Sequence, residues 1–205
     1  MWMIFFRKGS SITMDKRTWA EVDLDAIAHN IKEIRKITNP NAKIMAVVKA
    51  DAYGLAVAVL QEGKQLRSRG VTVPILILGA SGEEAVEDLI NFDITPSVFT
   101  YEFAKALSYE AERKEKVTKI HIKIDTGMSR IGFLAGENNE EIVDEIIKIS
   151  KLPYIEIEGI FSHFATSDEY DKSYTLLQYG RFMDVCNRLE EKGLNIPIKH
   201  ICNSA

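Results

Sequence analysis

The chain has 205 residues, of which 46% are hydrophobic and 27% are charged, and its net charge is −4. This length suits one large domain or two small ones with a sizeable core, and the composition excludes a disordered tail. Nucleic-acid binding is not indicated, because it needs clustered Lys and Arg and the chain has no basic block. Cys186 and Cys202 have no CxxC spacing, which favours a reducing compartment or core packing over a disulfide scaffold.

The chain opens with a short apolar run at residues 2–6. A membrane span needs about 20 apolar residues, so this run is too short to be one. It also lacks a positively charged region before it and a small-residue cleavage site after it, so a signal peptide is not indicated. We expect residues 1–13 to be a disordered or frayed extension and the domain to begin at Met14.

Short apolar runs then alternate with amphipathic stretches. The first helix is predicted to begin near Asp23 and to stop at Asn39-Pro40-Asn41. Ser81 and Glu84 predict a capping box before a helix that ends at Asn91. Apolar periodicity predicts further helices over 102–114, 138–151 and 171–192. Apolar runs predict strands over 19–24, 44–49, 74–78, 97–100, 119–124, 155–161 and 198–202.

Alternating strands and helices with apolar strands imply a parallel sheet covered by helices, an α/β fold. Seven strands suit a TIM-type (β/α)8 barrel that is incomplete and lacks its last helix. An open doubly wound sheet is the alternative architecture. No GxGxxG follows the first strand, which weakens a dinucleotide-binding interpretation.

Polar side chains follow the predicted strands, at the end where a parallel barrel forms its active site. Each has a simpler explanation when taken singly: a solvated loop lysine, a surface salt-bridge arginine, a hydrogen-bonded structural histidine, or a turn or helix cap. Together they predict the mouth of a pocket. These residues are Lys49, Arg130, His163, Asn203 and Ser204.

Lys123 is unusual because it alternates with isoleucines in the strand KIHIKI. It must face away from them, toward the barrel interior or the helix layer, and neither suits an unpaired ammonium. The alternative is a lysine whose stem is buried while its head reaches water.

Four motifs, VVKADAYG, KIDTGMSRIG, HFATSDE and NSA, occur in this order at strand ends. Together they resemble the alanine racemases, which are fold-type III pyridoxal-phosphate enzymes, over about residues 17–205. The resemblance implies a cytoplasmic homodimer without a metal, which interconverts L-alanine and D-alanine for peptidoglycan synthesis. It implies no nucleic-acid or membrane partner.

The resemblance also implies roles for residues near the cofactor. Lys49 would bind pyridoxal phosphate covalently through a deprotonated amine and act as one of two bases at the substrate Cα. Tyr53 and Ser204 would hold the cofactor phosphate, with Asn203 shaping that turn.

Three further residues would lie around the cofactor ring. His163 would lie beside the pyridine ring. Arg130 would bind near the phenolic oxygen and the substrate carboxylate, where a bidentate donor fits. Lys123 matches a position that is often carbamylated, which would turn a buried cation into an anion able to pair with Arg130.

The sequence departs from the family after Gly54, where about one helix–strand unit is missing and Leu55 follows directly. A parallel partner for the strand over 44–49 needs a crossover of about a dozen residues, which are not there. We expect residues 55–69 to form one helix, leaving seven strands, so that residues 57–62 are helical. Alternatively, the sequence lacks residues that the protein contains, and the barrel is intact.

The chain ends at Ala205, before the family's C-terminal β domain, which supplies the second base, a tyrosine, from the partner subunit. We therefore expect a fragment with little or no racemase activity. The alternatives are a single-domain pyridoxal-phosphate homeostasis protein and a non-catalytic pseudo-enzyme. A decarboxylase of the same fold type fits the DTGMSRIG loop less well, and the sequence does not separate alanine from serine as substrate.

Overall fold

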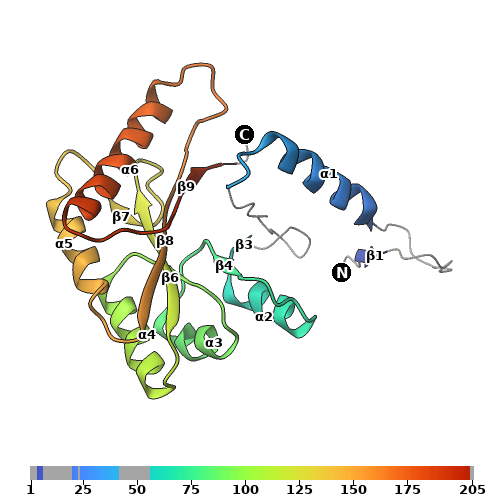
Figure 1. The fold of residues 1–205 in the computed structure, drawn as a ribbon, viewed down its shortest axis with the longest axis horizontal. Helices are drawn as coiled ribbons and strands as arrows, with labels where there is room; N and C mark the ends of the chain where they lie inside the picture. The colour runs from blue at the N-terminus through green and yellow to red at the C-terminus, as the bar shows by residue number, and fades with distance from the viewer. Residues whose placement is uncertain (1–3, 7–19, 23, 42–55, 204–205) are drawn as a thin grey trace. The chain divides into compact units, whose positions relative to one another are not determined.

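The structure, a computed structural model, describes residues 4–6, 20–22, 24–41 and 56–203 (Figure 1). The chain divides into two compact units, residues 1–54 and residues 55–205, each of which is described by itself. The predicted strand over 44–49, with Lys49, and the motif residue Tyr53 lie outside the described residues, as does Ser204.

The first unit contains a pair of parallel strands and one helix. Strand β1 (Ile4–Phe6) pairs with β2 (Ala20–Val22), so these three residues of the predicted extension are paired rather than frayed. The boundary at Met14 lies outside the described residues and stays a prediction. Helix α1 (Leu24–Ile37) is confirmed. It ends as predicted, where Asn39 Oδ1 accepts a hydrogen bond from Asn41 N at 2.9 Å.

The second unit is built from parallel strands with helices between them. The helices are α2 (Leu60–Ser68), the 3₁₀ turn η1 (Glu83–Ala85), α3 (Val86–Asn91), α4 (Tyr101–Arg113), α5 (Glu140–Ile149) and α6 (Ser173–Glu191). The strands are β3 (Ala56–Val57), β4 (Leu76–Ile77), β5 (Ser97–Val98), β6 (Thr118–Asp125), β7 (Phe133–Leu134), β8 (Ile155–His163) and β9 (Ile198–Cys202).

These strands neighbour one another in chain order. β3 pairs with β4, and β5, β6, β8 and β9 form a parallel sheet with β7 beside β6. A bridge between Leu76 and Thr95 joins the two sheets just before β5. A doubly wound sheet would reverse its strand order at a switch point, and the strands that the structure describes in this unit show no such reversal. The fold is therefore a TIM-type barrel, unclosed and incomplete, as predicted.

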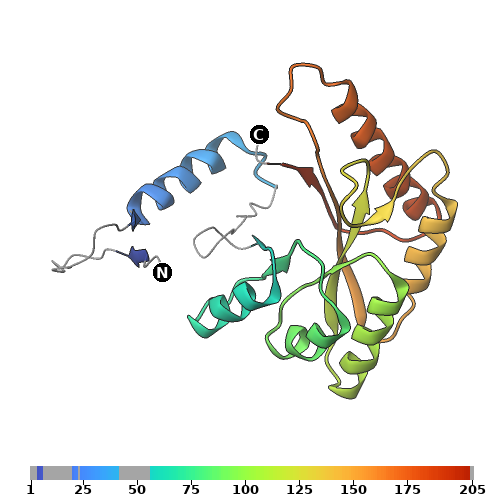
Figure 2. The ribbon, with the colours of Figure 1, turned by 180° about the vertical axis from the view of Figure 1, so that it is seen from behind.

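Helices α4, α5 and α6 lie along one side of β6, β8 and β9 (Figures 1 and 2). The core lies between these two layers. Alternation along β6 puts its isoleucines there, while its other face turns to the barrel interior. The largest fully buried side chains are Phe182, Ile75, Ile77, Leu89, Ile90, Leu107, Ile120, Ile122, Ile124, Ile146, Ile149 and Ile160.

The prediction of one helix over 55–69 is wrong. Ala56 and Val57 are extended and pair with Leu76 and Ile77, and the helix begins only at Leu60. Helix propensity did not decide the conformation of these residues. A strand beside β4 gains ladder hydrogen bonds, whereas differences in helix propensity amount to tenths of a kcal/mol per residue. Glu62 then stabilises the helix start, since its carboxylate accepts from Ala58 N at 2.8 Å.

The predicted capping box of Ser81 and Glu84 is also wrong. Gly82 is the residue before η1, and no side chain caps that turn. The helix nevertheless ends at Asn91, as predicted. The other helix predictions are confirmed within two residues at each end. Thr100 caps α4 through a hydrogen bond from Phe103 N.

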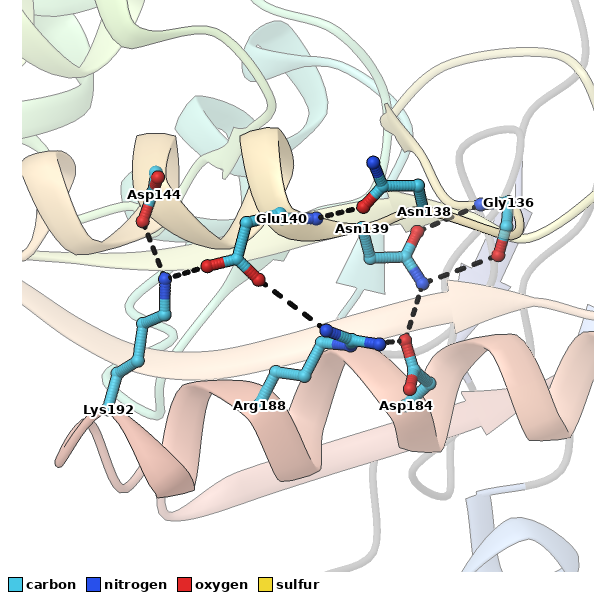
Figure 3. A network of polar contacts seen from close by, with 8 residues as sticks. All are labelled: Gly136, Asn138, Asn139, Glu140, Asp144, Asp184, Arg188 and Lys192. Carbon is cyan, nitrogen blue, oxygen red and sulfur yellow. Dashed lines mark hydrogen bonds and ion pairs between the residues drawn. The ribbon is translucent and has the colours of Figure 1, made fainter.

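A polar network ties α5 to α6 (Figure 3). At its centre is Asn139, 1% exposed, which donates to Asp184 at 2.7 Å and accepts from Gly136 N at 2.9 Å. Arg188 binds the same Asp184 carboxylate at 2.9 Å. The turn before α5 is therefore fastened to the middle of α6.

Candidate functional site

The predicted site residues that the structure describes lie at the carboxyl ends of β6, β8 and β9. Arg130 lies in the loop after β6, His163 is the last residue of β8, and Asn203 follows β9. Asn203 Oδ1 accepts a hydrogen bond from Ser167 Oγ at 2.6 Å, and Phe164 N donates to Cys202 O at 3.2 Å. The motif after β8 thus contacts the motif after β9.

Asp125 organises the loop that carries Arg130. Its carboxylate accepts hydrogen bonds from the backbone of Gly127, Ser129 and Arg130 at 2.9–3.0 Å. Burial pushes the pKa of Asp125 upward, but these three donors together with the charge of Lys123 outweigh it and leave the pKa below its ordinary value. The backbone of the loop is therefore fixed up to residue 130, although the Arg130 side chain is exposed.

Two glycines make this loop possible. Gly127 has a φ of +138° and Gly132 a φ of +130°, conformations that side chains strongly disfavour. A Cβ on Gly132 would also lie 2.5 Å from the backbone nitrogen of Asp125. The two glycines of the DTGMSRIG motif are thus required by the backbone conformation of the loop, and the same motif supplies Arg130.

Lys123 lies inside the barrel, with its whole side chain buried. It is 4% exposed, and its ammonium lies 4.9 Å from the centre of the Phe161 ring. Its Nζ donates to the carbonyl of Ile124 at 3.1 Å. The alternative in which the ammonium reaches water is wrong. Burial, with a contribution from Arg130, lowers the pKa of Lys123 to about 8, against the opposing effect of Asp125.

His163 belongs to the same electrostatic group. Burial lowers its pKa below the ordinary value, and the charges of Arg130 and Lys123 lower it further. At neutral pH the imidazole is therefore neutral beside two basic side chains. Among the described residues, the carboxylate whose charge acts on Lys123 is that of Asp125, and it accepts hydrogen bonds from the loop backbone. This end of the barrel is suited to an anionic ligand.

A second group of polar side chains inside the barrel was not predicted from the sequence. His121 Nδ1 lies 3.3 Å from His200 Nε2, and the His200 ring stacks on Phe161 with centroids 4.8 Å apart. Burial, followed by His121 and Lys123, lowers the pKa of His200 to about 4. The strand KIHIKI could have indicated His121, because alternation places it on the same face as Lys123.

Gln178 was missed as well. It lies on the inward face of α6, four residues before Phe182, and is completely buried. A polar residue in an apolar helical stripe was the signal that could have identified it. Among the described residues, no group of three His, Cys, Asp or Glu side chains could hold a metal ion.

Basic side chains at the carboxyl ends of the strands of a TIM-type barrel suit a small anionic molecule, because barrels of this class bind their ligands at that end. The family model for the alanine racemase N-terminal domain matches residues 22–205. The chain belongs to this family.

Similar proteins include curated and solved alanine racemases. The chain is 48% identical to the alanine racemase of Clostridium tetani over 91% of its length, and 47% identical to that of Methanococcus maripaludis over 91%. The alanine racemase structure from Clostridium difficile superposes with a TM-score of 0.88 and 40% identity, over 94% of this chain. The chain spans about half the length of these relatives, 52–54%.

Proposed function

We propose that this chain is the cofactor-binding barrel of an alanine racemase, a pyridoxal-phosphate enzyme that interconverts L-alanine and D-alanine in the cytoplasm for peptidoglycan synthesis. The observation that carries the proposal is the family match over residues 22–205, together with relatives named alanine racemase at 47–48% identity. In the part of the chain that the structure describes, no helix is long and apolar enough to cross a membrane.

The described residues fit pyridoxal phosphate in charge. The cofactor carries a phosphate and an acidic phenolic oxygen, and the described residues offer Arg130 and the buried Lys123, while the Asp125 carboxylate accepts hydrogen bonds from the loop backbone. We assign Arg130 to the phenolic oxygen and the substrate carboxylate, His163 to the ring, and Asn203 to the phosphate turn. The contact between Asn203 and Ser167 supports this last assignment, because it fixes the turn after β9.

Three assignments rest on the motifs alone. Lys49 would hold the cofactor covalently and move the proton at the substrate Cα, while Tyr53 and Ser204 would bind the phosphate. When bound, the cofactor supplies an electron sink for the carbanion. The protein would orient the substrate carboxylate through Arg130, and the role of Lys49 would require its amine to be deprotonated.

We also propose that Lys123 is carbamylated. An uncharged amine adds to carbon dioxide and releases one proton, and a pKa of about 8 makes the uncharged form accessible near neutral pH. The product is an anion at a buried position near Arg130, where a cation is destabilised. The modification would replace repulsion between two cations by attraction.

Racemisation removes a proton from one face of Cα and returns it to the other, so it needs two bases. The resemblance places the second base, a tyrosine, in a C-terminal domain of a partner subunit, in a homodimer. We therefore expect residues 1–205 by themselves to bind the cofactor weakly at best and to racemise alanine little or not at all. The relatives do not favour the single-domain homeostasis protein.

The unit missing after Gly54 remains part of the proposal. The match to the Clostridium tetani racemase runs over 204 positions although it takes in 91% of this chain. Such a difference arises when the relative has residues inside the matched region that this chain lacks, which supports an internal deletion.

The proposal is tested by an absorbance scan of the purified chain with pyridoxal phosphate. We expect a visible band from the covalently bound cofactor, and its loss in Lys49→Ala. Lys199→Ala is the control, because Lys199 is an exposed lysine on β9. A band that survives in Lys49→Ala would overturn the assignment, and no band at millimolar cofactor would favour the pseudo-enzyme.

A further inference from the structure

The buried side-chain amide of Gln178 makes three hydrogen bonds. It projects from α6 and has no exposed surface. Its Nε2 donates to Thr126 Oγ1 at 3.2 Å and to the His163 carbonyl at 3.1 Å. Its Oε1 accepts from Ala165 N at 2.9 Å. Both amide hydrogens and the oxygen are therefore used, which is how a buried amide is tolerated.

The partners of Gln178 belong to two different strand ends. Thr126 follows β6 directly, and His163 and Ala165 mark the end of β8 and the loop after it. Thr126 Oγ1 and Ser162 Oγ also hydrogen bond to each other, at 2.9 Å. Thr126 and Ser162 are 0% and 2% exposed. A buried hydrogen-bond network thus joins β6 and β8 where the ladder between the strands ends.

Two other residues on the same face of α6, one on each side of Gln178, also hydrogen bond to the loop after β6. Tyr174 Oη donates to the Gly127 carbonyl at 2.8 Å, and Arg181 Nη1 donates to the Thr126 carbonyl at 3.1 Å. Residues 174, 178 and 181 are spaced by one helical turn each, so they share one face. Within this set Gln178 alone reaches both strand ends.

We propose that Gln178 is a positioning residue, which sets the loop that carries Arg130 against the strand end that carries His163. The inference rests on the proposed function for the role of these two residues. Arg130 lies four residues beyond Thr126, and the Asp125 carboxylate fixes the backbone between them. Its hydrogen bonds go to the Thr126 hydroxyl and to the backbone of His163 and Ala165, so Gln178 acts through these groups and not through the Arg130 or His163 side chains.

The test compares two variants with the unchanged chain. Gln178→Met keeps the length of the side chain and removes all three hydrogen bonds. Gln178→Glu keeps the acceptor for Ala165 N and removes the donors to Thr126 and His163. The control is Asn187→Asp, an amide-to-carboxylate change at an exposed position of the same helix.

Two readouts need no cofactor. The first is amide hydrogen exchange of residues 126–132 and 163–167, which we expect to rise at least tenfold in both variants and not in the control. The second is the titration of the His163 ring by NMR. Its pKa should move toward the ordinary value, because its surroundings and its distance to Arg130 and Lys123 would no longer be fixed.

Cofactor affinity is the third readout, and we expect Gln178→Met to bind pyridoxal phosphate about tenfold more weakly than the unchanged chain. If the unchanged chain binds no cofactor, the proposed function fails for this chain while the first two readouts still decide the role of Gln178. Folded variants with unchanged exchange and an unchanged His163 titration would overturn it. Loss of folding in both variants would overturn it too, since Gln178 would then support the fold rather than the site.

Discussion

The imidazole of His121 occupies the space that a side chain at Gly159 would need. The two residues lie side by side in register on β6 and β8, and a Cβ on Gly159 would lie 2.3 Å from His121 Cε1. The strand β8 therefore approaches the buried ring directly, and the glycine in IEIEG is required by packing in the barrel interior.

Gly159→Ala should destabilise the chain by about 1–3 kcal/mol, because the added methyl group overpacks a buried site. Denaturant unfolding measures the change. His121→Ala in the same chain should restore part of it, as a double-mutant cycle would report. Gly180→Ala is the control: no atom lies within 4 Å of its added Cβ, and in a helix it should be neutral or stabilising by up to about 1 kcal/mol. Equal effects at the two glycines would contradict the packing explanation.

The lowered pKa of Lys123 predicts an alkaline gain in stability for the unmodified amine. Between pH 8 and about 10.5 the unfolded chain holds a proton on this lysine that the folded chain has lost. The free energy of unfolding should therefore rise with pH in this window, by up to about 3 kcal/mol, and be flat below it.

The measurement is denaturant unfolding in carbonate-free buffer, compared with Lys123→Met, which lacks the titrating group. A rise of the same size in Lys123→Met would show that other groups cause it. With bicarbonate present, intact mass spectrometry near neutral pH should detect the carbamate on the unchanged chain and not on Lys123→Met.

His200 should make the fold sensitive to acid. Its pKa is about 4 in the folded chain and higher in the unfolded chain, where burial, His121 and Lys123 no longer act. As pH falls from about 6.5 to 4, only the unfolded chain takes up this proton, so stability should drop by up to about 3 kcal/mol. His200→Asn should lessen that drop, and NMR should show the His200 ring neutral at pH 5. A charged ring at pH 5 would contradict its burial.

Asn139 should contribute more to the stability of the fold than the ion pairs around it. Asn139→Ala removes hydrogen bonds with Gly136 and Asp184 from a buried position, which should destabilise the chain by about 1–3 kcal/mol. Lys192→Ala removes two ion pairs of the same network, with Glu140 and Asp144, but these are solvated and should contribute less than about 1 kcal/mol. Thermal unfolding of both variants measures the two effects. A larger loss of stability in Lys192→Ala than in Asn139→Ala would contradict this prediction.

The sequence by itself determined most helices and strands of the second unit. Apolar spacing located α4, α5 and α6, because a stripe of apolar side chains at helical spacing gives a helix one face to bury, and β9 covers the same residues as the predicted strand over 198–202. It also indicated Arg130, His163 and Asn203, since the carboxyl ends of parallel strands meet on one side of a barrel.

Tertiary structure decided the elements that depend on a neighbour. Ala56 and Val57 are extended because β4 offers them a ladder, and β7, which was not predicted, exists because Phe133 and Leu134 lie beside the end of β6. A strand of two residues is too short to show the alternation of apolar and polar side chains, so the sequence could not predict β3 or β7.

The network around Gln178 and the pair of His121 and His200 also came only from the fold. The hydrogen bonds between their members join residues 13 to 79 positions apart along the chain. Local pattern reports which side of an element is buried, but it does not report which distant polar groups meet there. The folded barrel makes that choice, because each buried hydrogen-bonding group must find its partner among the side chains that packing brings within reach.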